Sequence, residues 1–237
     1  MDKIFGSKKA KKEGGEYWMS VSDLMAGLMM VFLFISVALM RNAMNERDKI
    51  KEVAVTYNQT QQALYAALHK EFEKDLTKWG AELDRESLSL NFKSPDVLFA
   101  NGDSRLSPKF KLILANFFPR YLSILDKFKA SIQEIRIEGH TSSAWNYDSS
   151  DEEAYFNNMM LSQTRTRSVL KYLMELPSVK KNDYQWVKAN VAAVGYSSSK
   201  LITMDNGRED AERSRRVSFR VITNAETQIR KILVGGN

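Results

Sequence analysis

The sequence predicts an α+β protein with one N-terminal transmembrane helix, a helical linker and a C-terminal α/β sandwich with a mixed sheet. Three observations lead to this class. Residues 24–40 form an uncharged apolar run, apolar residues recur at helical spacing through residues 44–83, and strand and helix patterns alternate through residues 86–222. The 237 residues suffice for one ordinary domain with these additions.

Residues 17–41 form the predicted transmembrane helix, and its residues 17–40 alone span about 36 Å, enough to cross a bilayer. Tyr17 and Trp18 fall where interfacial aromatic side chains lie, and Arg41 closes the far end. A cleaved signal peptide is the alternative. The apolar run is longer than a usual signal core, however, and no clear A-x-A cleavage site follows it.

A basic tail, residues 1–16, precedes this helix and indicates its orientation. Its lysines are Lys3, Lys8, Lys9, Lys11 and Lys12. Because basic flanks favour the cytoplasmic side, we expect a single-pass protein of the cell inner membrane with a cytoplasmic N-terminus and a periplasmic C-terminal domain. The net charge of +6 does not indicate direct nucleic-acid binding, since the rest of the chain is nearly balanced.

Asp23 is an ionisable residue at the edge of the apolar run. An ionised carboxylate at membrane depth is costly, so such residues usually face a protein interior or an ion path. Asp23 shares one helical face with Gly27, Met30 and Phe34, and small residues beside it suit close helix packing. We therefore predict an ion-coupling carboxylate that faces a partner helix. A shallow carboxylate that snorkels or caps the helix is the alternative.

Residues 42–84 are predicted to form a helical periplasmic linker. Its apolar residues at helical spacing are Ile50, Val53, Tyr57, Leu64, Leu68, Phe72, Leu76, Trp79 and Leu83. The pattern indicates one long helix, or two with a break near residues 59–62, packed on a second copy or on the following domain. A solvated flexible linker is the alternative.

Residues 85–223 are predicted to form the C-terminal domain, and a tail of residues 224–237 follows. Ser107 and Pro108 suit the start of a helix that ends near Asp126. A second helix is expected from about Met160 to Leu176. Strands are expected in residues 86–92, 132–140, 189–196 and 215–222.

Five ordered blocks of this domain resemble the OmpA-like peptidoglycan-binding domain family. The blocks are FANGDSRLSP, IRIEGHTSS, NMMLSQTRTRSVLKYL, VAAVGYSSSKLI and SRRVSFRV. A spanning helix with an Asp soon after a Trp, then a helical linker and this domain, resembles the layout of MotB-like stator subunits. Over nearly its whole length the chain is similar to the MotB-like membrane subunits of the Zorya anti-phage defence system.

The resemblance to OmpA-like domains implies a site for the diaminopimelate of the peptidoglycan stem peptide. Arg165 matches the family arginine that holds this group, and Asn158 and Ser162 match its neighbours. Thr141 and Ser142 belong to the block that reads H-T-D in the family. Because Ser142 stands in place of the family aspartate, one half of the charge-complementary clamp is missing.

Arg215 and Arg216 match the paired arginines of the last block. His140 is expected to order the end of a strand rather than to perform chemistry. The segment 143–157 is longer than the usual OmpA loop, and its acidic residues would restore negative charge if they faced the site; a solvated loop is the alternative. These residues are Asp148, Asp151, Glu152 and Glu153.

Together these features predict a stator-like subunit of an ion-driven inner-membrane motor, which anchors the complex to peptidoglycan and acts in anti-phage defence. By resemblance, two copies would form a homodimer inside a ZorA-like (MotA-like) pentamer in the lipid bilayer, with H+ or Na+ as the coupling ion. A flagellar MotB-like stator and a passive cell-wall anchor without ion conduction are the alternatives. Transport energisers that resemble TolR or ExbD lack the OmpA-like blocks.

The sequence offers little support for an enzyme. The chain contains no cysteine, which excludes a thiol nucleophile and a cysteine zinc site. No nucleophile–base pair, metal-ligand spacing or phosphate-binding loop emerges. We therefore expect no catalytic residues, metal or cofactor.

Overall fold

The computed structural model describes residues 10–93, 98–99, 103–225, 227 and 229, with side chains from residue 18 onward. The chain divides into two compact units, and the division falls after Val53. Helix α1 (Ala10–Trp79) contributes residues to both units. It begins seven residues before the predicted start at residue 17, so part of the basic tail 1–16 belongs to the helix, whereas residues 1–9 lie outside the described residues.

The part of α1 in the N-terminal unit is long and apolar enough to cross a membrane. Its most apolar window of 18 residues has a mean hydropathy of 2.2, and none of that window is buried within the chain. Large apolar side chains from Trp18 to Met40 are exposed. In water such a surface would be unfavourable, which agrees with the predicted apolar helix.

The second unit is built on a five-stranded sheet with the order β1–β2–β5–β3–β4. The strands are β1 (Ala81–Asp84), β2 (Ser89–Lys93), β3 (Ile132–His140), β4 (Val191–Gly195) and β5 (Arg216–Thr223). Strands β3 and β4 are parallel, and the other neighbouring pairs are antiparallel. The predicted mixed sheet and the α+β class are therefore confirmed.

Strand β1 differs from the prediction that the linker is helical as far as residue 84. The helix ends at Trp79, and Gly80 has a φ of 63°. Glycine adopts this left-handed conformation without steric cost, which lets the chain leave the helix at once. Ala81 then pairs with Phe92 of β2.

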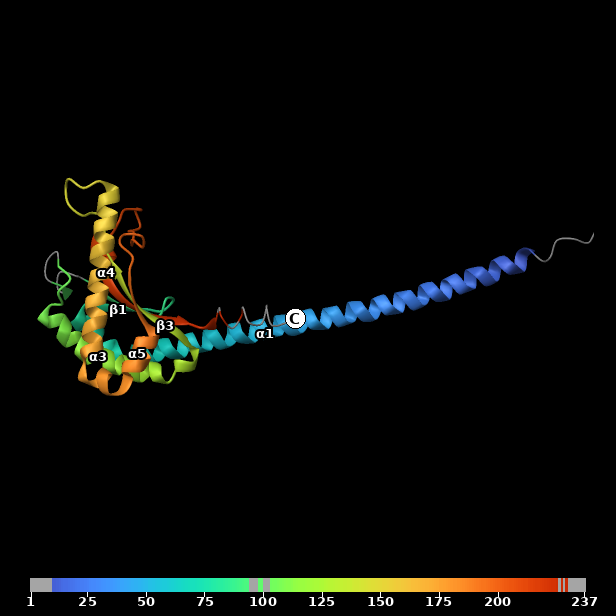
Figure 1. The fold of residues 1–237 in the computed structure, drawn as a ribbon, viewed down its shortest axis with the longest axis horizontal. Coiled ribbons are helices and arrows are strands. Elements are labelled where there is room, and N and C mark those ends of the chain that lie inside the picture. Colours follow the sequence, from blue (N-terminus) through green and yellow to red (C-terminus); the bar gives the residue numbers. More distant parts are fainter. Residues whose placement is uncertain (1–9, 94–97, 100–102, 226, 228, 230–237) are drawn as a thin grey trace, which may run out of the picture. The chain divides into compact units, whose positions relative to one another are not determined.

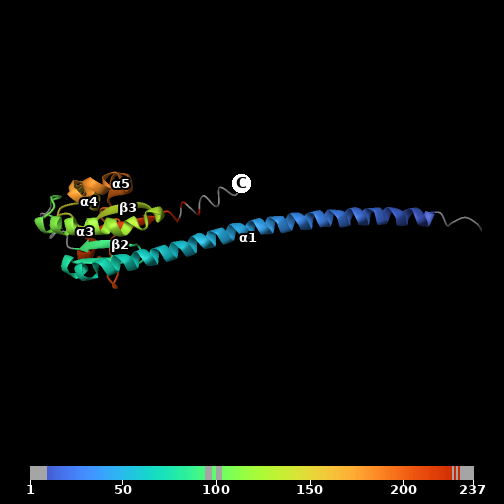
Figure 2. The ribbon, with the colours of Figure 1, turned by 90° about the horizontal axis from the view of Figure 1, so that it is seen from below.

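Among its described residues the second unit also contains the α-helices α3 (Pro108–Asp126), α4 (Asp151–Glu175), α5 (Tyr184–Asn190) and α6 (Ala211–Ser214). Helix α3 begins as predicted, with the Ser107 hydroxyl accepting a hydrogen bond of 3.0 Å from the Phe110 amide. Figure 2 shows α3 between α4 and the end of α1.

Helix α4 begins nine residues before the predicted start at Met160. Ser150 and Glu153 form a capping box, in which the Glu153 amide donates to the Ser150 hydroxyl (3.3 Å) and the Ser150 amide donates to the Glu153 carboxylate (3.1 Å). The expected loop of residues 143–157 is therefore wrong in its second half, because residues 151–157 are helical.

The core of the second unit joins α1, α3 and one face of the sheet. Phe72 of α1 lies 5.2 Å from Phe117 of α3, measured between ring centroids, and Phe117 lies 5.0 Å from Phe219 of β5. Leu64 and Leu68 are also fully buried, so the end of α1 packs on the domain and is not a flexible linker. The helix has no break at residues 59–62.

Candidate functional site

Arg165 projects from α4 and is held by the loop that precedes α3. Its Nε donates a hydrogen bond of 3.0 Å to the Asp103 carbonyl, and its guanidinium carbon lies 4.8 Å from the centroid of the Phe99 ring. The side chain is only 8% exposed. A bridge between Phe99 and Leu106 closes the loop. These contacts fix the plane in which the guanidinium meets an incoming group.

The segment after β3 is held from two sides. The Asn158 side chain of α4 donates to the carbonyls of Ser142 and Ala144, both at 3.2 Å. On the other side the Ser143 amide donates to Glu209 Oε1 at 3.0 Å, and the Ser143 hydroxyl donates to the other oxygen of the same carboxylate. The structure therefore brings Asn158 and Ser142 together and places an acid, Glu209, beside them.

Ser162 and Thr141 both hold the turn after β4. The Ser162 hydroxyl accepts a hydrogen bond of 3.2 Å from the Ser197 amide, and the Thr141 amide donates to the Ser197 carbonyl at 2.9 Å. The Ser197 hydroxyl donates to the Tyr155 carbonyl at 2.6 Å. Both sequence-predicted residues are buried, so their contacts to Ser197 position the backbone around the site.

Two glycines let α4 approach the ends of the parallel strands. Gly139 pairs with Gly195 across β3 and β4. A Cβ atom on Gly195 would lie 2.5 Å from the Gln163 amide nitrogen, and a Cβ on Gly139 would lie 2.8 Å from the Ser162 carbonyl oxygen. Only glycine permits this contact. The backbone of α4 therefore lies close against the ends of β3 and β4. Figure 1 shows α4 lying across the sheet.

Comparison with known proteins gives the family of this chain. Residues 98–215 match the OmpA family. Zorya protein ZorB from Escherichia coli is 56% identical over 234 residues, which cover 98% of this chain and 99% of that protein. The chain belongs to the ZorB family. The resemblance to the membrane subunits of Zorya systems is thereby confirmed.

Solved structures that are similar to part of this ZorB-family chain have a lower sequence identity to it. The cell wall anchor of the T6SS from Pseudomonas aeruginosa has a TM-score of 0.44 and 18% identity, covering 66% of this chain and 96% of its own. A putative MotB like protein from Desulfovibrio vulgaris has a TM-score of 0.42 and 20% identity, with coverages of 75% and 98%. The periplasmic domain of Helicobacter pylori MotB (residues 78–256) has a TM-score of 0.41 and 20% identity, with coverages of 65% and 89%.

Arg216 lies apart from Arg165 in this member of the ZorB family. It lines a separate cavity of about 350 Å3 together with Glu138 and His140, on the polar face of the sheet. Its Nη1 donates to the Ser214 carbonyl at 3.1 Å and to the Lys200 carbonyl at 3.4 Å. Burial lowers the pKa of Arg216, although the charges of Glu138 and Glu82 oppose the shift.

Arg215 and His140, which the sequence also singles out, lie near Arg216. Arg215 is half-buried and His140 is buried. Arg215 follows α6 directly as its C-cap residue, and its Nε is buried without a hydrogen-bond partner among the described residues. His140 stacks on Tyr196 with ring centroids 5.3 Å apart, and its Nε2 lies 3.4 Å from a Glu138 carboxylate oxygen. Burial lowers the pKa of His140, although Glu138 opposes the shift, so the imidazole is neutral at pH 7. A neutral, stacked imidazole agrees with the predicted role of ordering the strand end.

The acidic residues of the segment 143–157 are mostly part of α4. Asp151, Glu152 and Glu153 occupy its first turn, where carboxylates interact favourably with the helix dipole. Asp148 is exposed. The acid that contacts the segment after β3 is Glu209, which lies 66 positions from Ser143 and was not predicted from the sequence.

Asp23 is exposed on α1, and no neighbour within the described chain covers its face. A Cβ on Gly27, one helical turn later, would meet nothing within 4 Å. This face of the helix is therefore available to another chain.

Proposed function

We propose that this ZorB-family chain is a stator-like subunit of an ion-driven motor of the bacterial inner membrane that acts in anti-phage defence. One observation carries the proposal. A membrane-length apolar helix with a carboxylate on an uncovered face is joined in one chain to an OmpA-family domain with a held arginine. A passive anchor has no use for the carboxylate.

The second unit would anchor the complex to peptidoglycan. Arg165 offers a planar guanidinium, which binds a carboxylate with two parallel hydrogen bonds. Asn158 and Ser162 hold the strand ends against α4, and Thr141 and Ser142 complete this wall. The carboxylate of Glu209, beside Ser143, supplies negative charge on the side where the family has its aspartate. A diaminopimelate side chain, which carries a carboxylate and an ammonium group, matches this arrangement of charges.

The N-terminal unit would supply the coupling. Asp23 would alternate between protonated or ion-bound and ionised states against the helices of a partner subunit. Moving one elementary charge across the membrane releases about 2.3 kcal/mol per 100 mV, which suffices for a conformational step. The part of the chain that the structure describes contributes one such helix, so a homodimer inside a ZorA-like pentamer would complete the path for H+ or Na+. The N-terminus would be cytoplasmic and the second unit periplasmic, where peptidoglycan provides a fixed point for torque.

Substitution of the carboxylate tests the coupling. In cells that carry the complete defence system, Asp23→Asn should abolish protection against phage while membrane level and co-purification with the partner subunit stay unchanged. The matched control is Asp48→Asn, an exposed acid on the same helix. Full protection by Asp23→Asn would show that the chain is a passive anchor.

Co-sedimentation with sacculi tests the anchor. The full chain in detergent should sediment with purified sacculi, and Arg165→Ala should lower the bound fraction at least tenfold because a charged hydrogen bond is lost. If the wild-type chain stays in the supernatant, the anchoring function is wrong.

A further inference from the structure

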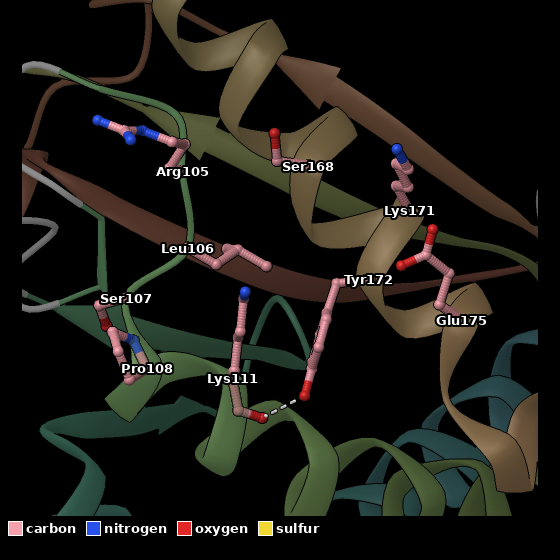
Figure 3. Close-up of a pocket in the computed structure, with 9 residues that line it drawn as sticks. All are labelled: Arg105, Leu106, Ser107, Pro108, Lys111, Ser168, Lys171, Tyr172 and Glu175. Atoms are coloured by element: carbon pink, nitrogen blue, oxygen red, sulfur yellow. Dashed lines mark hydrogen bonds between the residues drawn. The ribbon is translucent and has the colours of Figure 1, made fainter.

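A groove of about 640 Å3 lies between the start of α3 and the outer face of α4. Figure 3 shows Arg105 from the loop before α3, Lys111 from α3 and Lys171 from α4 around this hollow. Its volume lies in the range of binding pockets for small ligands and peptides.

The groove has a fixed apolar wall. Leu106 and Tyr172 line it, and the Tyr172 hydroxyl donates a hydrogen bond of 3.0 Å to the Lys111 carbonyl. The Lys111 ammonium lies 5.9 Å from the centroid of the Tyr172 ring. The hydrogen bond ties α4 to α3 at this point, so the groove is formed before any ligand arrives.

The charges that line the groove are mainly positive. Arg105, Lys111 and Lys171 are the basic residues of its lining, and Glu175 is the acidic one. Arg105 pairs with the Asp103 carboxylate, which leaves the two lysines as the main cationic groups of the groove. An extended ligand that carries carboxylates complements this lining.

The groove begins where the Arg165 site ends. Ser168 and Tyr172 follow Arg165 on α4 by three and seven positions, so the three side chains lie along one face of the helix. Asp103 contacts both the Arg165 site and the groove. Its carbonyl accepts a hydrogen bond from Arg165, and its carboxylate forms an ion pair with Arg105. The groove therefore lies next to the place where Arg165 would hold a ligand.

We infer that this groove binds the part of the peptidoglycan stem peptide that extends beyond the group held by Arg165, with Lys111 and Lys171 receiving its carboxylates. The inference rests on the proposed anchoring function. The occupant is the peptide rather than the glycan, because the stem peptide carries free carboxylates whereas the amino-sugar strand offers the lysines no comparable charge.

A double charge reversal tests the inference on the full chain in detergent. Lys111→Glu with Lys171→Glu should weaken binding to purified sacculi about tenfold, since two ion pairs are replaced by repulsion. The matched control is Lys180→Glu with Lys181→Glu, which makes the same charge change at exposed positions of the short helical segment Val179–Asp183 outside the groove. The control should bind as the wild type does.

The choice between peptide and glycan needs two further probes. The soluble stem tetrapeptide should lose affinity for the double variant by the same factor, whereas glycan strands freed of peptides should bind both proteins equally. Lys111→Gln with Lys171→Gln, which removes charge without reversing it, should show a smaller loss of affinity. This variant tests the groove even if the charge-reversal variant misfolds.

The outcomes distinguish binding in the groove from anchoring through Arg165. Equal binding of the groove variant and its control, in a protein whose binding still depends on Arg165, overturns the groove and leaves the anchor. A loss seen with glycan strands and not with the tetrapeptide assigns the groove to glycan and also overturns the inference. If the wild-type chain binds no sacculi, the proposed anchoring function and the inference fail together.

Discussion

Arg165 and Phe99 form a stacked pair, with the guanidinium carbon 4.8 Å from the ring centroid. The two residues come from α4 and from the loop before α3. Phe99 is only 1% exposed, so the ring supports the guanidinium from inside the domain. The face of the arginine is thereby occupied, and its edge is the part that meets a carboxylate.

We predict that Phe99→Leu weakens binding to sacculi several-fold. Leucine keeps an apolar side chain in the core but removes the aromatic face, which contributes about 0.5–2 kcal/mol to such a stack. Co-sedimentation of the full chain measures the change. Phe156→Leu removes an exposed ring from α4, the helix that carries Arg165, and should have no effect. Unaltered binding by Phe99→Leu would mean that the ring does not orient Arg165.

Gly195 lets the backbone of α4 approach the end of β4 closely. We predict that Gly195→Ala destabilises the second unit. The added Cβ would lie 2.5 Å from the Gln163 amide nitrogen, which is backbone and can move only if the helix moves. Overpacking of this kind costs about 1–3 kcal/mol, which lowers the melting temperature by several degrees. Calorimetry measures this, with Thr164→Ala on the exposed side of α4 as the control. A melting temperature equal to that of the wild type would show that the contact is not tight.

The sequence predicted those parts of the fold that depend on local signals. The start of α3 follows from Ser107 and Pro108, which act on their own helix. The early start of α4 is also local, since Ser150 and Glu153 have the capping-box spacing, but the acidic run around them was interpreted as a loop. Strand β1 has only four residues and is defined by its pairing with β2, which no local pattern reveals.

Some residues of the candidate site were predicted from a local motif, and others are brought together only by the fold. Arg165, Asn158 and Ser162 were predicted because they fall in one motif on one helix. Glu209 was missed because it reaches Ser143 across 66 positions, and only the fold brings them together. Arg216 stands next to Arg215 in the sequence, yet it lines the separate cavity with Glu138. Alternation along a strand sends neighbouring residues to opposite faces, and a motif does not show which face holds the site.

We predict that the free energy of unfolding falls at acidic pH because His140 is buried. Burial lowers its pKa in the folded protein below the value of about 6.5 expected after unfolding. The unfolded chain therefore binds more protons at low pH, so the free energy of unfolding falls as the pH drops below about 6.5. Melting temperatures at pH 7.5 and 5.5 should differ more for the wild type than for His140→Gln.

His69 provides the control for this prediction, since it is the other histidine of the chain and lies on α1. His69→Gln should keep the pH dependence of the wild type. If His140→Gln and the wild type lose stability in parallel between these pH values, protonation of His140 does not govern the acid sensitivity.

Glu209 holds both the amide and the hydroxyl of Ser143 with its two carboxylate oxygens, next to the position where OmpA-like domains carry an aspartate. We predict that Glu209→Gln weakens binding to the stem tetrapeptide several-fold, because the ammonium group of the ligand loses the negative charge beside it. Asp148→Asn removes an exposed acid from the same region and should leave binding unchanged. Adding Ser142→Asp to Glu209→Gln should restore affinity, since the charge returns one residue away. If Glu209→Gln lowers the melting temperature and tetrapeptide binding falls only in proportion to the unfolded fraction, Glu209 has a purely structural role.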